Sequence, residues 1–197
     1  MRSLSTPRLL KTLESNPNNP PLCQAPDQVL KKPGLVLDEH ACDCHAHICG
    51  PATLFPYSSK RIYTPPDALL PQYRALLNHL GIERAVLVQP SIYADDNRAL
   101  LAALKVDPLH LRGITVVDWE ISEQDLEKMH HAGVRGVRCN IVDLAEAKGV
   151  LPIMKLRYLA DKIAPLGWHI EFLMHVNELP DLDQTLRHFP VPIVLGH

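Results

Sequence analysis

The stretch ACDCHAHICG combines side chains that can bind zinc or stabilise negative charge on a carbonyl oxygen. Residues two positions apart share a face of a β-strand, so Asp43, His45 and His47 are predicted to point together into the molecule. Cys42 and Cys44 then point the other way and pack under helices as small apolar side chains. Because a zinc site with these cysteines would need ligands from both faces of one strand, a His-x-His strand end is favoured.

Further polar side chains stand at or near the ends of later apolar runs. They are Gln89 and Ser91, Arg138 and Asn140, Glu171 and His175, and His197. The carboxyl ends of parallel strands meet at one edge of a sheet, so these groups are expected to converge on one rim. A guanidinium that faces inward is costly to bury without an anion, so Arg138 favours a substrate that bears a carboxylate. Glu171 is expected to be a member of a structural ion pair.

The elements that must position these residues alternate regularly along the chain. Short apolar or β-branched runs predict strands at 42–48, 84–90, 111–117, 133–140, 169–175 and 192–197. Amphipathic patterns predict helices at 67–80, 95–106, 122–132, 152–164 and 178–188. The segment TPPD at 64–67 and Ser122 are predicted helix starts, and Gly81, Gly133 and Gly167 are predicted helix ends.

Alternating strands and helices indicate a parallel sheet with crossover helices, either open and doubly wound or closed into a barrel. No G-x-G-x-x-G pattern follows the first strand, which favours the barrel. A complete (β/α)8 TIM barrel takes roughly 250 residues. We therefore predict an irregular leader over 1–37, then over 38–197 six strands and five helices of an α/β barrel truncated after strand six. The alternative is a natural open sheet of six strands.

The composition limits the partners and the compartment. The formal net charge is -2, so no basic surface for nucleic acid or an anionic membrane is expected, and a small molecule or a protein is the expected partner. No apolar run is long enough to span a bilayer. The basic first residues allow a transit peptide, but the cytoplasm is favoured. An odd number of cysteines, five, argues against a disulfide framework and favours reduced thiols in a cytosolic protein. The sequence leaves the oligomeric state open.

Five segments resemble the amidohydrolase superfamily, and within it the group that contains the 2-pyrone-4,6-dicarboxylate lactonases. They are DCHAHICG, RIYTPPDALL, HLGIERAVLVQPSIYADDN, HHAGVRGVRCN and VPIVLGH. The resemblance implies a (β/α)8 barrel that opens a carboxylated lactone by adding water. It implies that His45 and His47 lie beside the reacting carbonyl and that His197 is the sixth-strand catalytic histidine.

The resemblance also implies a substrate pocket lined by Tyr63, Ser91 and Arg138, to which the strand positions add Gln89 and Asn140. The general base is expected to be an aspartate at the end of an eighth strand, which this sequence does not reach. The dicarboxylate lactonases are expected to carry further basic groups after strand four, where this chain has Asp143, Leu144 and Glu146. This departure leaves the identity of the lactone open.

Metal dependence is the second open point. Many superfamily members hold two metals bridged at the end of strand four, a position that Asn140 occupies here, so such a centre is not expected. The resemblance implies a lactonase without a metal cofactor. The alternative is a site for a single zinc ion bound by His45, His47 and either His175 or His197.

Two other functions remain as alternatives. One is a metal-dependent decarboxylase or amide hydrolase on the same barrel. The other is an inactive fragment or a non-catalytic binding protein. A six-strand segment leaves its first and last strands as unpaired edges, so this chain by itself is expected to self-associate and to lack hydrolase activity.

Overall fold

The computed structural model describes residues 20–27, 29–142, 151–179 and 181–196. Within them one sheet holds six parallel strands in the order β1-β2-β3-β4-β5-β6. The strands are β1 (Cys42–Ala46), β2 (Arg84–Val88), β3 (Leu111–Thr115), β4 (Val134–Asn140), β5 (His169–Leu173) and β6 (Ile193–Leu195). The helices are α1 (Leu70–Leu80), α2 (Arg98–Val106), α3 (Glu123–His131), α4 (Ile153–Ile163) and α5 (Leu182–Leu186). Short 3-10 turns are η1 (Ser91–Tyr93), η2 (Ala164–Leu166) and η3 (Val176–Glu178).

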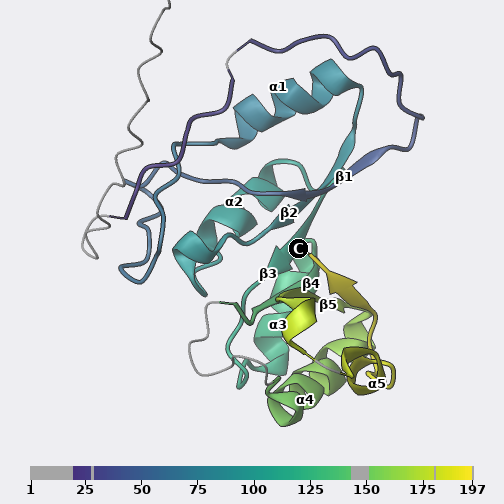
Figure 1. The fold of residues 1–197 in the computed structure, drawn as a ribbon. Coiled ribbons are helices and arrows are strands. Elements are labelled where there is room, and N and C mark those ends of the chain that lie inside the picture. The colour runs from purple at the N-terminus through teal and green to yellow at the C-terminus, as the bar shows by residue number, and fades with distance from the viewer. Residues whose placement is uncertain (1–19, 28, 143–150, 180, 197) are drawn as a thin grey trace, which may run out of the picture.

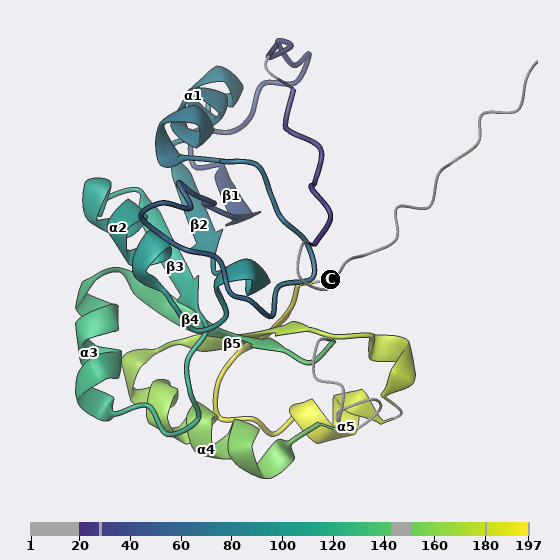
Figure 2. The same ribbon diagram turned by 90° about the vertical axis from the view of Figure 1, so that its left-hand side faces the viewer.

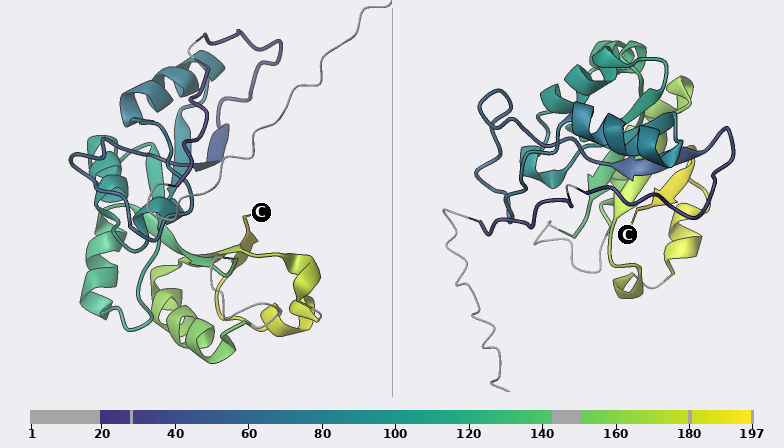
Figure 3. Two further views of the ribbon diagram at one scale, coloured as in Figure 1. Left: turned by 60° about the vertical axis from the view of Figure 1, so that its left-hand side comes forward. Right: turned by 90° about the horizontal axis from the view of Figure 1, so that it is seen from above.

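The sheet curves, and the helices follow its outer face (Figures 1 and 2). The arc of strands with the helices outside it forms a half-barrel (Figure 3, left). Every neighbouring pair of strands is parallel, and one helix lies between each pair along the chain. The predicted barrel-type α/β fold with six strands is confirmed.

The main core lies between the strands and the helices. Leu87 of β2, Val137 of β4 and Ile170 of β5 point to this side and are almost fully buried with Leu104 of α2 and Leu156 of α4. Burying an aliphatic side chain of this size contributes about 1.5–3 kcal/mol. The opposite, concave face carries the polar residues Arg138 and Glu171 together with the apolar Val88 and Ile114.

The predicted helix boundaries are confirmed where the signal is local. The backbone N–H of Asp125 donates to the Ser122 hydroxyl at 3.1 Å at the start of α3. Gly81, Gly133 and Gly167 adopt φ of 75°, 102° and 67°, which glycine reaches without a steric penalty.

The predicted helix start at TPPD is wrong. Helix α1 begins at Leu70, and its N-cap is Leu69. Thr64 instead pairs with the extended segment before β1: its N–H donates to the Pro21 carbonyl at 2.8 Å, and its carbonyl accepts from Cys23 at 2.9 Å. A long-range backbone pairing therefore replaces the local capping pattern.

Strand β1 departs from regular alternation through a bulge. Asp43 pairs with Ala85 and Ala46 pairs with Leu87, so β1 advances three residues while β2 advances two. Both Asp43 and Ala46 therefore face the helices, and the Tyr73 hydroxyl of α1 donates to the Asp43 carboxylate at 2.8 Å. The prediction that Asp43 shares a face with the two histidines is wrong, because the extra residue changes the parity of the strand.

The prediction that Cys42 and Cys44 pack under the helices is also wrong, since both are exposed. Cys49 and Cys139 are buried, and burial raises the pKa of their thiols to about 11 and about 12. These two thiols are therefore uncharged at neutral pH and pack as apolar groups. No helix in the described ranges combines the length and apolar character needed to cross a membrane.

Candidate active site

A cavity of about 300 Å³ opens where β2 and β4 end. It brings together most of the side chains predicted to bind a substrate, namely Gln89, Ser91, Arg138 and Asn140. Its other lining residues are Ser58, Lys60, Ala94 and Val116. Gln89 and Arg138 are 49 residues apart in the chain, and the ends of the two parallel strands bring them together.

Arg138 enters this cavity from the concave face of β4. Its register partner on β5 is Glu171, whereas the adjacent pair Val137 and Ile170 lies in the core, so Arg138 and Glu171 point away from the helices. The Arg138 side chain is only 5% exposed. Its Nη1 donates to the Gln89 carbonyl at 3.1 Å, and its Nε lies 3.5 Å from Glu171 Oε1. The guanidinium is therefore anchored to the strands on both sides of the site.

Glu171 also lies beside the first histidine. Its side chain is 4% exposed, and its Oε1 lies 3.6 Å from Nδ1 of His45. Burial raises the pKa of the Glu171 carboxyl, and the positive charge of Arg138 opposes that rise. His45, Glu171 and Arg138 consequently form a row across the concave face, from β1 to β5 to β4.

His47 stands next to His45 at the end of β1. The two ring centroids are 5.0 Å apart and the rings meet edge to face at 80°. Nδ1 of His47 lies 2.8 Å from the Val88 carbonyl oxygen, and a carbonyl only accepts, so Nδ1 carries the proton. This contact orients the second imidazole.

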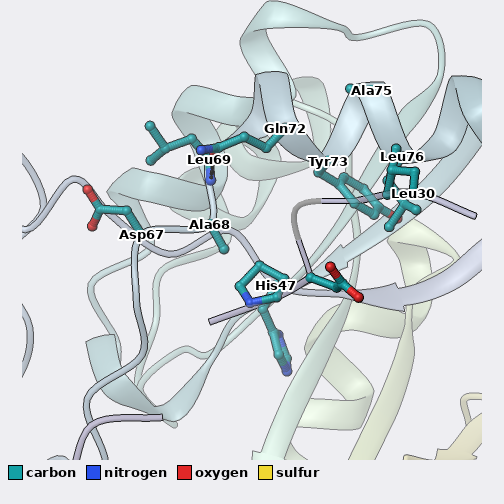
Figure 4. A pocket seen from close by; sticks show the side chains of 11 residues that line it. Leu30, His47, Asp67, Ala68, Leu69, Gln72, Tyr73, Ala75 and Leu76 are labelled. Carbon is teal, nitrogen blue, oxygen red and sulfur yellow. Dashed lines mark hydrogen bonds between the residues drawn. The ribbon is translucent and has the colours of Figure 1, made fainter. Parts of the chain in front are cut away.

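His47 also borders a second cavity, of about 320 Å³, which lies between α1 and the residues Pro26, Asp27 and Leu30. Figure 4 shows His47 below Gln72 and Tyr73 of α1. The apolar side chains of Leu30 and Leu76 lie along the same space. The first cavity, at the ends of β2 and β4, surrounds Arg138 and is called the Arg138 cavity; neither His45 nor His47 lines it.

Tyr63 and Ser91 form a pair close to Arg138. Burial raises the pKa of Tyr63, while a hydrogen bond with the Ser91 side chain and the charge of Arg138 oppose the rise. Tyr63 therefore keeps its proton at neutral pH and can donate it to an anionic ligand. The structure thus brings Tyr63 close to the predicted binding residues.

Gln89 has a structural task at the same site. Its side chain is fully buried, and Nε2 donates to the carbonyls of Ala94 at 3.3 Å and Asp96 at 2.9 Å. These bonds hold the loop between β2 and α2 against the end of β2. A direct contact between the Gln89 amide and a substrate remains a prediction.

The residues that the structure describes do not form the alternative single-zinc site of His45, His47 and His175. His175 is exposed at the start of η3, and over the described ranges no three His, Cys, Asp or Glu side chains are placed to hold a metal ion. The predicted positions of His197, Asp143 and Glu146 fall outside the described residues. The catalytic role of His197, and a zinc site that includes it, remain predictions.

Sequence reasoning missed Lys60. It lines the Arg138 cavity from the loop after β1, and its ammonium has no hydrogen bond or ion pair to any described residue. Its backbone N–H donates to Ser58 Oγ at 3.2 Å, which shapes this loop. The only available signal was its place in the same loop as Tyr63.

Residues 42–197 match the family model described as amidohydrolase. The chain belongs to the amidohydrolase family. Among curated amidohydrolase relatives, it is 39% identical over 166 residues to the 2-pyrone-4,6-dicarboxylate hydrolase of Comamonas testosteroni, covering 84% of this chain and 54% of that protein. It is 31% identical over 177 residues to the 4-sulfomuconolactone hydrolase of Rhizobium radiobacter, covering 90% of this chain and 59% of that protein.

Solved structures agree with this family assignment. A candidate 2-pyrone-4,6-dicarboxylic acid hydrolase from Pseudomonas putida superposes with a TM-score of 0.65 at 35% identity, over 80% of this chain and 56% of that one. A candidate 2-pyrone-4,6-dicarboxylic acid hydrolase from Acinetobacter baumannii, solved with citric acid bound, superposes with a TM-score of 0.68 at 25% identity. The match covers 77% of this chain and 56% of that one. This amidohydrolase chain spans a little over half the length of these relatives.

Proposed function

We propose that the protein, in its complete form, is a hydrolase that opens a carboxylated lactone by adding water. The observation that carries this proposal is the buried Arg138, which faces Ser91 and Asn140 in one cavity and is linked through Glu171 to His45. Two relatives named as hydrolases of 2-pyrone-4,6-dicarboxylate and of 4-sulfomuconolactone support the same reaction class.

In the proposed mechanism, Arg138 binds the substrate carboxylate, and Tyr63, Ser91 and Asn140 complete its hydrogen bonds. Water adds to the lactone carbonyl carbon. His45 and His47, each with a second proton on Nε2 as imidazolium groups, stabilise the negative charge that forms on the carbonyl oxygen. The ring C–O bond then breaks and the leaving oxygen takes up a proton. His197 is the third proposed catalytic histidine, and the proposed general base is an aspartate outside this sequence.

We propose that no metal cofactor takes part, with a single zinc as the alternative. A metal-dependent decarboxylase or amide hydrolase of the same family would need stoichiometric metal. Metal analysis of the active protein, with activity measured before and after chelation, separates these reactions. Lactone opening that continues after the metal is removed is the expected result.

The direct test uses protein expressed from the complete coding sequence beside the 197-residue chain alone. Both are incubated with 2-pyrone-4,6-dicarboxylate and with 4-sulfomuconolactone, and ring opening is followed by chromatography. The complete form is expected to hydrolyse at least one of them. The 197-residue chain is expected to self-associate and to be inactive, because Val194 and Leu195 of the edge strand β6 are 41% and 51% exposed. A folded, complete protein that opens no carboxylated lactone refutes the proposal.

Lys60 is expected to contact a second acidic group of the substrate. The Lys60→Met variant should raise KM for a doubly charged lactone about tenfold, because a hydrogen bond to a charged group contributes roughly 1.5–3 kcal/mol. KM for a lactone with a single carboxylate should stay unchanged. The exposed Lys105 of α2 gives the control variant Lys105→Met, for which both KM values should match the wild type. Equal KM changes for both lactones would remove this role from Lys60.

We propose that 38–197 forms the barrel segment and that 1–37 is a leader. The proposed partner is a small carboxylated lactone and not a nucleic acid or a membrane, and the proposed compartment is the cytoplasm.

A further inference from the structure

Glu171 is a buried carboxylate in the middle of β5. The residue is 3% exposed, and its Oε1 makes no hydrogen bond to any residue that the structure describes. Removing a carboxylate from water costs several kcal/mol unless opposite charges compensate. Its position therefore needs an explanation beyond packing.

A single oxygen of Glu171 faces both functional groups of the proposed site. Oε1 lies 3.6 Å from His45 Nδ1 and 3.5 Å from Arg138 Nε. His45 belongs to β1 and Arg138 to β4, so the two are not neighbours in the sheet. Only the curvature of the sheet lets a side chain from β5 reach both.

The end of β6 leaves space for this carboxylate. A side chain at Gly196 would place its Cβ 3.0 Å from Oε1, closer than an ordinary contact. The Gly196 N–H donates to the Phe172 carbonyl at 2.9 Å, which fixes its backbone beside β5. The Glu171 carboxylate thus lies against a backbone position without a side chain.

We propose that Glu171 is a positioning residue for the lactone hydrolysis proposed above, on which this inference rests: its carboxylate holds His45 and Arg138 at a fixed separation. A carboxylate beside Nδ1 keeps the proton on that nitrogen and sets the orientation of the ring. The same carboxylate holds the Nε edge of the guanidinium in place. The substrate carboxylate and the reacting carbonyl are then bound at the distance that the reaction needs.

A purely structural ion pair would behave differently from a positioning residue. Replacing a buried pair member with a neutral group of the same shape would then change stability and leave the kinetics of the folded protein unchanged. A positioning residue changes kcat through His45 and KM through Arg138. The KM effect should also depend on the charge of the substrate, because only a carboxylated lactone uses Arg138.

The experiment compares Glu171→Gln with Glu127→Gln, which changes an exposed glutamate of α3, in protein made from the complete coding sequence. Glu171→Gln should lower kcat by about tenfold to a hundredfold, since small displacements of catalytic groups have effects of this size. KM should rise for a carboxylated lactone and not for an uncharged lactone of the same ring. Glu171→Asp should recover part of the loss. Glu127→Gln should match the wild type throughout.

A measurement independent of activity separates this inference from the proposed function. The ¹⁵N chemical shifts of the His45 ring report which nitrogen carries the proton, and they should change in Glu171→Gln and not in Glu127→Gln. If the wild-type protein opens no lactone while these shifts change, the proposed function fails and the contact between Glu171 and His45 stands. Should Glu171→Gln not fold, Glu171→Asp is measured in its place. Wild-type kinetics, or unchanged His45 shifts, in a folded variant overturn the inference.

Discussion

The His45→Gln variant is expected to open a carboxylated lactone at least a hundredfold more slowly than the wild type. Removal of one group that stabilises a developing oxyanion costs about 10²–10³ in kcat, or roughly 2.7–4 kcal/mol. KM should change little, because the interaction strengthens only as negative charge forms. Steady-state kinetics on the complete protein measure both constants.

The control for His45 is His79→Gln, which changes an exposed histidine near the end of α1. It should retain wild-type kcat and KM. His47→Gln should also lose at least a hundredfold in kcat, because both imidazoles are proposed to face the carbonyl oxygen. A His45→Gln variant with wild-type turnover would exclude His45 from the chemistry.

The Arg138→Met variant is expected to have the largest combined effect. Its kcat/KM for a carboxylated lactone should fall about 10²- to 10³-fold, because the buried cation that binds the carboxylate is lost. Its free energy of unfolding should also fall by roughly 3–5 kcal/mol, because Glu171 stays buried without its cationic partner. Chemical denaturation and steady-state kinetics measure the two effects.

The double variant Arg138→Met/Glu171→Met separates stability from binding. Replacement of a whole buried ion pair by apolar side chains of similar volume is often neutral or stabilising, so the free energy of unfolding should return toward the wild type. The activity should not return. Arg98→Met removes an exposed pair with Asp96 and should alter neither quantity measurably. A double variant that regains activity would show that Arg138 does not bind the substrate.

The elements of this half-barrel follow closely from local sequence patterns. All six strands and five helices lie within the ranges expected from hydrophobic periodicity, and Ser122 caps α3 as its side chain predicts. These features depend on neighbours within a few residues of one another along the chain. The family assignment rests on the same part of the chain, residues 42–197.

Long-range pairing decided the features that the sequence did not predict. The bulge in β1 depends on its register with β2 and turns Asp43 toward Tyr73, a residue 30 positions away. Thr64 looked like a helix cap and instead bonds the extended segment before β1. Lys60 reaches the cavity only through the path of a long loop. In each case an interaction between distant segments overrides the local preference.

The sequence by itself determined the order of the strands, the barrel type and the chemical groups at the strand ends, because alternating apolar runs and parallel topology leave few other arrangements. Only the tertiary structure decided which of those groups meet. Arg138 and Glu171 are register partners on adjacent strands, but the 3.6 Å contact between His45 of β1 and Glu171 of β5 depends on the curvature of the whole sheet. Curvature is a sum of small twists over many paired residues, so no short stretch of sequence carries it.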